Sequence, residues 1–159
     1  HVSNFMVVKI DEGIGSGIML DGKLHTGLNE LGHTTIKYDG IRCPCGNRGC
    51  LERYASIGAI LKGTPYRTWK EAVDANDMDV IKKEASYLIP ALVNACNLFS
   101  LDVVVLASDI AYKSKMLLEL LNSQVSAQSL SSRVRIVRTN LSSSVQSAAV
   151  VAFDYFFHI

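Results

Sequence analysis

Four residues in the first third of the chain have the types and the spacing of a metal site. His33 is followed by Cys43, Cys45 and Cys50. One imidazole and three thiolates form the closed tetrahedral ligand set of structural zinc, whereas a catalytic zinc keeps one position open for water. The sequence therefore predicts one structural zinc ion bound by these four residues. The alternative is a group of free thiols beside an unrelated histidine.

The chain around these residues supports a metal rather than disulfides. Residues 27–49 show little periodicity and are rich in glycine, and a loop of this length in a compact domain needs something to hold it. A tight Cys-x-Cys-x4-Cys cluster with a nearby histidine is typical of a metal site in a reducing compartment. The fourth cysteine, Cys96, falls in an apolar pattern, and we expect it to be buried.

A second candidate is the glycine run Gly13, Gly15 and Gly17, which follows an apolar stretch. Such a run can approach phosphate groups, or it can simply permit a tight turn between strands. Asp11 and Glu12 precede it, and two carboxylates disfavour the approach of a polyanion. The sequence leaves both interpretations open.

Alternating strand and helix patterns surround these sites and predict an α/β fold. β-branched and apolar runs predict strands at 5–10, 101–106 and 134–137, and the Asp21-Gly22 pair predicts a hairpin. Helical periodicity or caps predict helices at 51–61, 68–76, 77–97, 113–128 and 143–157. Pro90 lies inside the longest helix, so we expect a bend near Leu88.

Composition limits the classes of protein that the chain can represent. Its 159 residues are 48% hydrophobic and 19% charged, which is the balance of one globular domain. The net charge is +1 and no Lys/Arg block occurs, so no nucleic-acid surface is predicted in this chain. No apolar stretch approaches the ~20 residues of a membrane span, and no signal peptide is apparent. We expect a cytoplasmic location, and since the chain opens on His1, a longer parent protein.

One long segment resembles a known family signature. It consists of Glu30-Leu31-Gly32-His33 and, from residue 40, GIRCPCGNRGCLERYAS. This segment closely resembles the signature of the ROK family, which groups repressors and sugar kinases on the actin/hexokinase-type (ribonuclease H-like) fold. The resemblance implies that residues 1–159 are a single C-terminal sugar-binding lobe, with a mixed sheet, helices and an inserted zinc loop at 30–52.

The resemblance also implies roles for individual residues. The signature histidine, His33, would bind both zinc and a sugar hydroxyl, and Glu30 and Glu52 would hold the sugar as well. Carboxylates accept hydrogen bonds from pairs of hydroxyl groups, which fits a sugar ligand. Surface charge or helix capping is the alternative role of the two glutamates.

Where nucleotide would bind, the chain departs from the family pattern. The family's catalytic Asp would lie upstream of His1, so no catalytic residue is assigned here. Kinases of the family carry Gly-Thr-Gly where this chain has residues 11–13, which makes Gly13, Gly15 and Gly17 a degenerate nucleotide element. The late strand ends in Ala107-Ser108-Asp109 instead of glycines, and the usual Gly-Asp is absent near residues 140–142. The stretch between Gly27 and Glu30 is also shorter than usual.

These departures favour a repressor-like member of the family over an enzyme. We expect a zinc-stabilised effector domain that senses a monosaccharide or amino sugar, forms a homo-oligomer, and reaches DNA only through a helix-turn-helix outside this chain. The first alternative is the C-terminal lobe of an ATP-dependent sugar kinase. The second is a zinc-stabilised interaction domain without a ligand, in which the apolar residues 151–159 drive self-association.

Overall fold

The chain folds around a five-stranded mixed sheet in a computed structural model that describes residues 2–130 and 133–140. The strand order is β3-β2-β1-β4-β5. Strand β1 pairs antiparallel with β2 and parallel with β4, and β4 pairs parallel with β5. The strands are β1 (Phe5–Ile10), β2 (Ile14–Leu20), β3 (Lys23–Leu24), β4 (Val103–Ala107) and β5 (Arg135–Arg138). The predicted α/β class with a mixed sheet is confirmed.

The hairpin between β2 and β3 forms at the predicted turn. Asp21 and Gly22 both have positive φ angles, of 51° and 72°. Two-residue hairpin turns of this kind match the twist of the flanking strands, which is why Asp-Gly pairs favour them.

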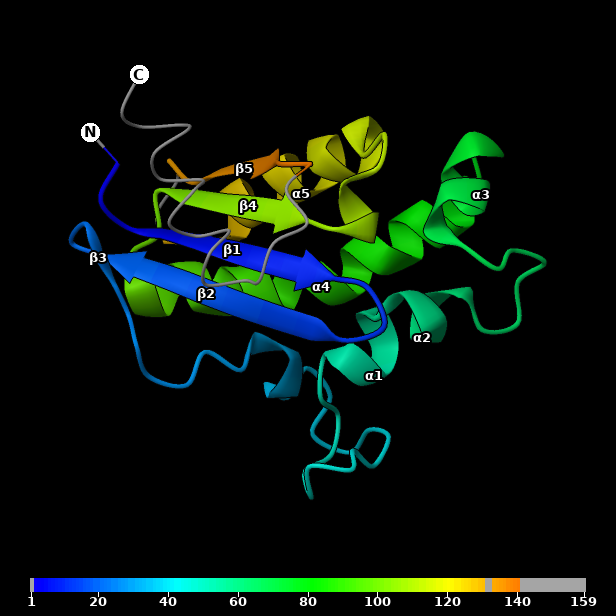
Figure 1. Ribbon diagram of the computed structural model, residues 1–159, viewed down its shortest axis with the longest axis horizontal. Coiled ribbons are helices and arrows are strands. Elements are labelled where there is room, and N and C mark those ends of the chain that lie inside the picture. Colours follow the sequence, from blue (N-terminus) through cyan, green and yellow to red (C-terminus); the bar gives the residue numbers. More distant parts are fainter. Residues whose placement is uncertain (1, 131–132, 141–159) are drawn as a thin grey trace.

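The long helices pack against one face of the sheet, as Figure 1 shows for α4. The larger core lies between this face and helices α4 and α5, and it includes Met6, Val8, Leu88 and Leu121. A smaller apolar cluster lies on the opposite face of the sheet. The helices are α1 (Glu52–Ala55), α2 (Ile57–Leu61), α3 (Trp69–Asp74), α4 (Met78–Phe99) and α5 (Lys115–Gln128), with short 3-10 helices η1 (Leu31–His33) and η2 (Asp109–Ala111).

Helix α4 begins and ends at defined caps. The Asp77 side chain accepts hydrogen bonds from the backbone N–H groups of Asp79 and Val80, and Ser100 ends the helix in the left-handed conformation. The helix continues through Pro90 without interruption. A mid-helix proline costs about 3 kcal/mol, and the apolar face that α4 buries offsets that cost. The bend near Leu88 stays a prediction.

Helix α3 carries the predicted N-terminal cap. The Thr68 side chain accepts a hydrogen bond from the backbone N–H of Glu71. The Glu71 carboxylate in turn accepts from the N–H of Arg67, at 2.8 Å. This is one residue earlier than the reciprocal bond of a capping box.

The single helix predicted at 51–61 is wrong, because this segment forms the two short helices α1 and α2. Ser56 separates them in an extended conformation, with ψ at 153°. The backbone N–H of Ile57 leaves the helical pattern and donates to the carbonyl of Asp11 at 2.8 Å. A contact with the β1–β2 turn therefore breaks the helix, and no local sequence pattern reports such a contact.

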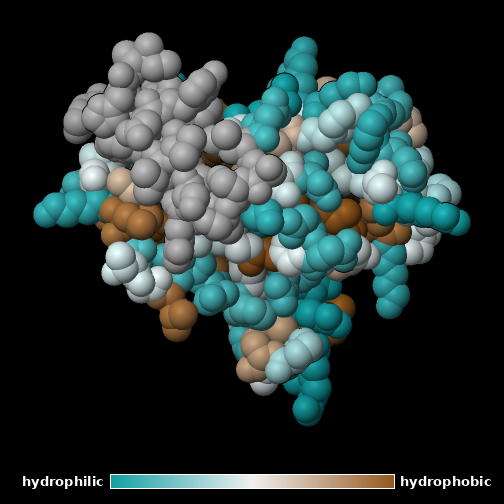
Figure 2. Space-filling view, in the orientation of Figure 1, coloured by the Kyte–Doolittle hydropathy of each residue, from teal (hydrophilic) through white to brown (hydrophobic). Residues whose placement is uncertain are grey.

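Two sequence predictions lie outside the described residues: the helix at 143–157 and the self-associating segment at 151–159. Within the described residues, no helix is long and apolar enough to cross a membrane. On the face drawn in Figure 2, the coloured hydrophobic residues form separate small patches among hydrophilic ones.

Candidate metal centre

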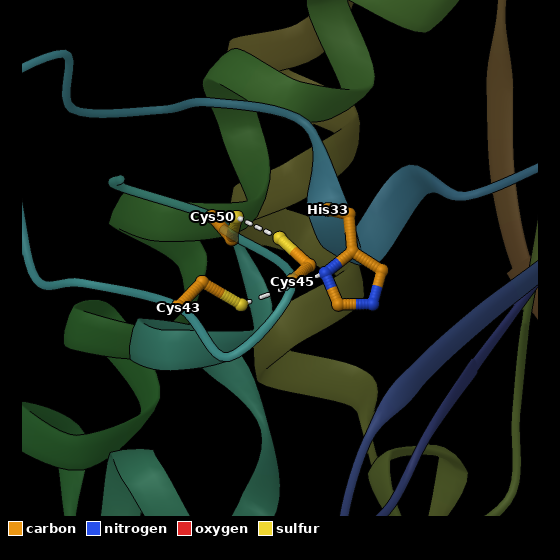
Figure 3. A group of neighbouring side chains, drawn as sticks. All are labelled: His33, Cys43, Cys45 and Cys50. Atoms are coloured by element: carbon orange, nitrogen blue, oxygen red, sulfur yellow. Dashed lines mark hydrogen bonds between the residues drawn. The ribbon is translucent and has the colours of Figure 1, made fainter. Parts of the chain in front are cut away.

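The four predicted ligands converge on one point. The ligand atoms of His33, Cys43, Cys45 and Cys50 all lie within 4.8 Å of one another. Figure 3 shows the Cys43 Sγ facing the His33 Nδ1 at 3.6 Å, and the Cys45 Sγ facing the Cys50 Sγ at 3.6 Å. A tetrahedral ion with Zn–S bonds of ~2.3 Å would hold two sulfurs about 3.8 Å apart. The donor set and its spacing therefore fit a metal ion.

Tight turns of the loop bring the ligands together. The backbone N–H of Gly46 donates to the Cys43 carbonyl at 3.0 Å, and the N–H of Cys43 donates to the Asn47 carbonyl at 2.9 Å. Gly46 and Gly49 have φ angles of 96° and 70°. A Cβ atom at Gly49 would overlap the Lys37 carbonyl oxygen. Glycine at position 49 is therefore required on both conformational and steric grounds.

The environment makes the thiols unequal. Hydrogen bonds from the Asn47 backbone and from Cys43 lower the pKa of Cys45 to about 7. Burial and the neighbouring thiols raise the pKa of Cys50 to about 12. Cys45 is thus ready to bind a cation as a thiolate near neutral pH, whereas Cys50 needs the charge of the ion to lose its proton.

A second attachment of the loop, one that the sequence analysis missed, involves Tyr54. Its hydroxyl accepts a hydrogen bond from the backbone N–H of Ile41 at 2.8 Å. Its ring lies 5.2 Å from the Tyr87 ring, and the Lys37 ammonium lies 5.3 Å from the Tyr54 ring centroid. Tyr54 belongs to the signature segment, and its position there was the only indication of a role.

Of the two signature glutamates, Glu52 lies beside the metal ligands. Its Oε1 is 3.8 Å from the His33 Nδ1 and 4.0 Å from the Cys43 Sγ. In Figure 3 the other ring nitrogen of His33 lies on the far side of the ring from Cys43. Glu52 is the first residue of α1, which begins two residues after the last candidate ligand, Cys50.

Glu30 is placed differently. It precedes η1, and its backbone carbonyl accepts the N–H of His33 at 3.0 Å. Its side chain is exposed and lines a cavity of about 630 Å³ between β2 and the C-terminal half of α4. Neither His33 nor Glu52 lines that cavity. The structure thus joins Glu30 to His33 through the backbone, without a contact between their side chains.

The three glycines of the predicted degenerate nucleotide element do not form one loop. Gly13 lies in the β1–β2 turn, whereas Gly15 and Gly17 lie inside β2 and pair with Lys9 and Val7. A Cβ atom on Gly13 would lie 3.7 Å from the Glu52 Oε2, so this turn is adjacent to the signature glutamate. A nucleotide role for these glycines stays a prediction.

The fold is that of a lobe of the actin/hexokinase-type fold, and it carries a His/Cys cluster that could bind a metal ion. A family match agrees with this. Residues 1–156 match the ROK family, to which the chain belongs. The chain is 32% identical over 139 residues to a xylose repressor of Bacillus subtilis (strain 168), covering 79% of this chain and 36% of that protein. It is 30% identical over 160 residues to the transcriptional dual regulator NagC of Escherichia coli (strain K12), covering 86% and 38%.

Solved structures share this lobe. A ROK family transcriptional regulator, described as a homologue of the E. coli MLC protein, superimposes with a TM-score of 0.77 at 28% identity, over 94% of this chain and 46% of that one. A ROK hexokinase from Thermus thermophilus superimposes with a TM-score of 0.71 at 23% identity, over 91% and 56%. Regulators and kinases therefore share this fold. The chain spans less than two fifths of the length of the two curated relatives described above.

Proposed function

We propose that the chain is the sugar-sensing, zinc-stabilised effector-binding lobe of a ROK-type transcriptional regulator and has no kinase activity. The observation that carries the proposal is the position of Glu52. Its carboxylate lies 3.8 Å from a metal ligand, His33, whose second ring nitrogen points away from the thiols. An ion that fixes this histidine also fixes the neighbouring carboxylate, and together they offer a hydrogen-bonding edge for vicinal hydroxyls.

Each site residue has a role in this proposal. Zinc is bound by His33, Cys43, Cys45 and Cys50, and it orders the loop at 30–52. Glu52 accepts hydrogen bonds from hydroxyl groups on one edge of a monosaccharide or amino sugar, and the His33 Nε2–H donates to the same edge. Glu30 is assigned to the same ligand by the signature alone, because its side chain lines a cavity that neither His33 nor Glu52 lines. Residues 1–159 act as one lobe, and a segment outside this chain completes the pocket.

The residues that follow β1 and β4 favour the regulator over the kinase. Asp11 and Glu12 follow β1, and Ser108 and Asp109 follow β4. Carboxylates at this edge oppose the phosphates of a nucleotide. The named relatives described above are repressors or regulators. DNA binding is assigned to a helix-turn-helix outside this chain, and the complete protein is proposed to be a cytoplasmic homo-oligomer.

The second candidate is the C-terminal lobe of an ATP-dependent sugar kinase. It is favoured by the superposition on a ROK hexokinase, although that likeness concerns the fold. Sugar-dependent formation of ADP by the complete protein would promote it over the regulator.

Calorimetry on the complete, zinc-loaded protein tests the proposal. The titrants are xylose, N-acetylglucosamine and glucose. We expect one of them to bind, and we expect Glu52→Gln to weaken binding at least about tenfold, since a charged hydrogen-bond acceptor is lost. Glu119→Gln is the matched control, because Glu119 is an exposed glutamate on α5 and should leave binding unchanged. If none of the three sugars binds, the sugar-sensing role is wrong and the ligand-free interaction domain is favoured.

A further inference from the structure

The cavity between β2 and the C-terminal half of α4 has the size and the lining of a small-molecule site. Its volume is about 630 Å³, and ligand pockets in proteins usually have ~300–1,000 Å³. Buried apolar side chains line it, among them Met6, Ile18 and Ala95. This lining favours the apolar part of a ligand, because binding there removes apolar surface from water.

Two leucines extend this apolar lining to the surface. Leu28, in the loop after β3, is 88% exposed, and Leu98, near the end of α4, is 76% exposed. A single exposed leucine is common on protein surfaces. Two that line the same cavity form a larger apolar patch, which is typical of ligand-binding grooves. Both side chains are therefore accessible to a ligand that enters the cavity.

Glu30 determines the charge of the cavity. Among the described residues that line it, Glu30 is the only one with an acidic side chain, and none is lysine or arginine. The Glu30 carboxylate is exposed and makes no hydrogen bond or ion pair within the part of the chain that the structure describes. Asn94 of α4, which is also exposed, adds a hydrogen-bonding amide to the lining. An unpaired carboxylate next to apolar surface favours a ligand with an apolar body and a cationic group.

The cavity is separate from the candidate metal centre, although both use η1. Leu31 and Thr34 line the cavity, whereas His33 and Glu52 do not. Residues three apart lie on the same side of a 3-10 helix, which explains why Leu31 and Thr34 share this position. The Thr34 hydroxyl also donates to the Leu31 carbonyl at 2.7 Å. A molecule in the cavity would therefore contact η1 without displacing a ligand at His33 or Glu52.

We propose that this cavity binds a small cationic amphiphile, whose apolar body lies between β2 and α4 and whose cationic group pairs with Glu30. The inference goes beyond the proposed sugar-sensing function, because it requires neither the metal ion nor a sugar. It gives Glu30 a ligand in the cavity that its side chain lines, in addition to the sugar to which the signature assigns it.

The charge of the ligand is tested with phenethylamine and phenylacetate, which combine the same aromatic ring with opposite charges. Binding to the complete protein is measured by ligand-observed NMR titration. We expect phenethylamine to bind at least about fivefold more tightly than phenylacetate, which is the size of effect that an exposed ion pair produces. Glu30→Gln should reduce this preference to less than about twofold and leave the binding of neutral phenethyl alcohol unchanged.

The location of the site is tested on α4. Asn94→Phe places an aromatic side chain in the cavity from an exposed position, so the binding of all three probes should be lost. Ser86→Phe is the matched control, because Ser86 is exposed on the same helix and does not line the cavity. If Asn94→Phe does not fold, Leu98→Arg decides, since a cation at that exposed position should weaken phenethylamine binding and favour phenylacetate.

Three results would overturn the proposal. The first is equal affinity for phenethylamine and phenylacetate. The second is a folded Asn94→Phe variant that binds the probes as tightly as the wild type. The third is the absence of probe binding to the wild type, and if Asn94→Phe then also dissociates the complete protein, this face is a contact between subunits. Sugar calorimetry with Glu52→Gln tests the proposed function separately, because Glu52 does not line the cavity and its loss should leave phenethylamine binding intact.

Discussion

The loop at residues 25–50 and the body, which is the sheet with its packed helices, are stabilised by different kinds of contact. Between β3 and α1 the only regular element is the three-residue helix η1, and three side chains in residues 25–50 are apolar and buried, namely Leu31, Cys43 and Cys50. In the body, β4 is buried at all five positions, and α4 buries nine residues. The loop thus depends on a few polar attachments, and the body depends on widely shared apolar contacts.

This difference predicts how the stability of each region responds to substitutions. A single polar contact is lost completely when one of its two partners is removed, because no neighbouring residue replaces it. Apolar burial is shared among many side chains, at about 25 cal/mol per Å², so each loss is partial. Polar substitutions should therefore be severe in the loop, and removal of a buried charge-bearing group in the body should be stabilising.

The largest expected effect comes from Cys45, a candidate metal ligand. Cys45→Ser removes one of four ligands, so we expect loss of the bound metal and of order in residues 34–50. The binding free energy of structural zinc is on the order of 10 kcal/mol, and the loop has little else to hold it. Metal content measured by mass spectrometry, with amide hydrogen exchange, checks both expectations.

Cys96→Ala is the matched control for the ligand variant. Cys96 is buried in the body, away from the cluster, and burial raises the pKa of its thiol to about 11. This variant should keep its metal and lower the stability of the body only modestly. An ordered loop in metal-free Cys45→Ser would contradict the proposed structural role of the ion.

An intermediate effect, of opposite sign, is expected at Glu84 in the body. Its side chain is fully buried on α4, and neither carboxylate oxygen has a hydrogen-bond partner within the described residues. Burial raises its pKa well above the usual 4.5. Above about pH 4.5 the unfolded chain loses this proton while the folded chain keeps it, so the free energy of unfolding decreases as the pH rises, by up to about 1.4 kcal/mol per unit.

Glu84→Gln removes that dependence, since an amide does not ionise in this range. We expect the variant to gain stability relative to the wild type as the pH increases from 5 to 8. Urea denaturation at each pH measures this difference, and Glu119→Gln, at an exposed position, should show none. A constant difference across the range would mean that Glu84 does not hold its proton in the folded state.

The smallest effect is expected at Tyr54, the loop attachment that does not depend on metal. Tyr54→Phe removes one hydrogen bond, to the Ile41 N–H, at a cost of about 1 kcal/mol. Amide exchange at Ile41 should accelerate while the metal is retained. Tyr87→Phe is the matched control, because the Tyr87 hydroxyl makes no hydrogen bond within the described residues. Loss of metal in Tyr54→Phe would show that the two attachments are coupled.

The sequence predicted the features that depend on local patterns and missed those that depend on contacts between distant segments. The ligands were predictable because cysteines and a histidine at these spacings have few other uses, and the strand at 5–10 because its apolar run has one interpretation. The break at Ser56 and the contact between Asp11 and Ser108 were not predictable. Both depend on segments far apart in sequence, and no local pattern reports them. Glu84 was missed because the periodicity of α4 is set by the apolar residues around it.

The sheet topology also determines the order in which the chain can fold during synthesis. Strand β1 pairs with β2 after a short turn, so Phe5 meets Met19 early, whereas its other neighbour in the sheet starts at Val103. At about 5–20 residues per second on the ribosome, the second edge of β1 stays open for several seconds. Unpaired strand edges are where chains aggregate. Residues 33–50 emerge within that interval, so the four candidate metal ligands can come together while the sheet is still incomplete.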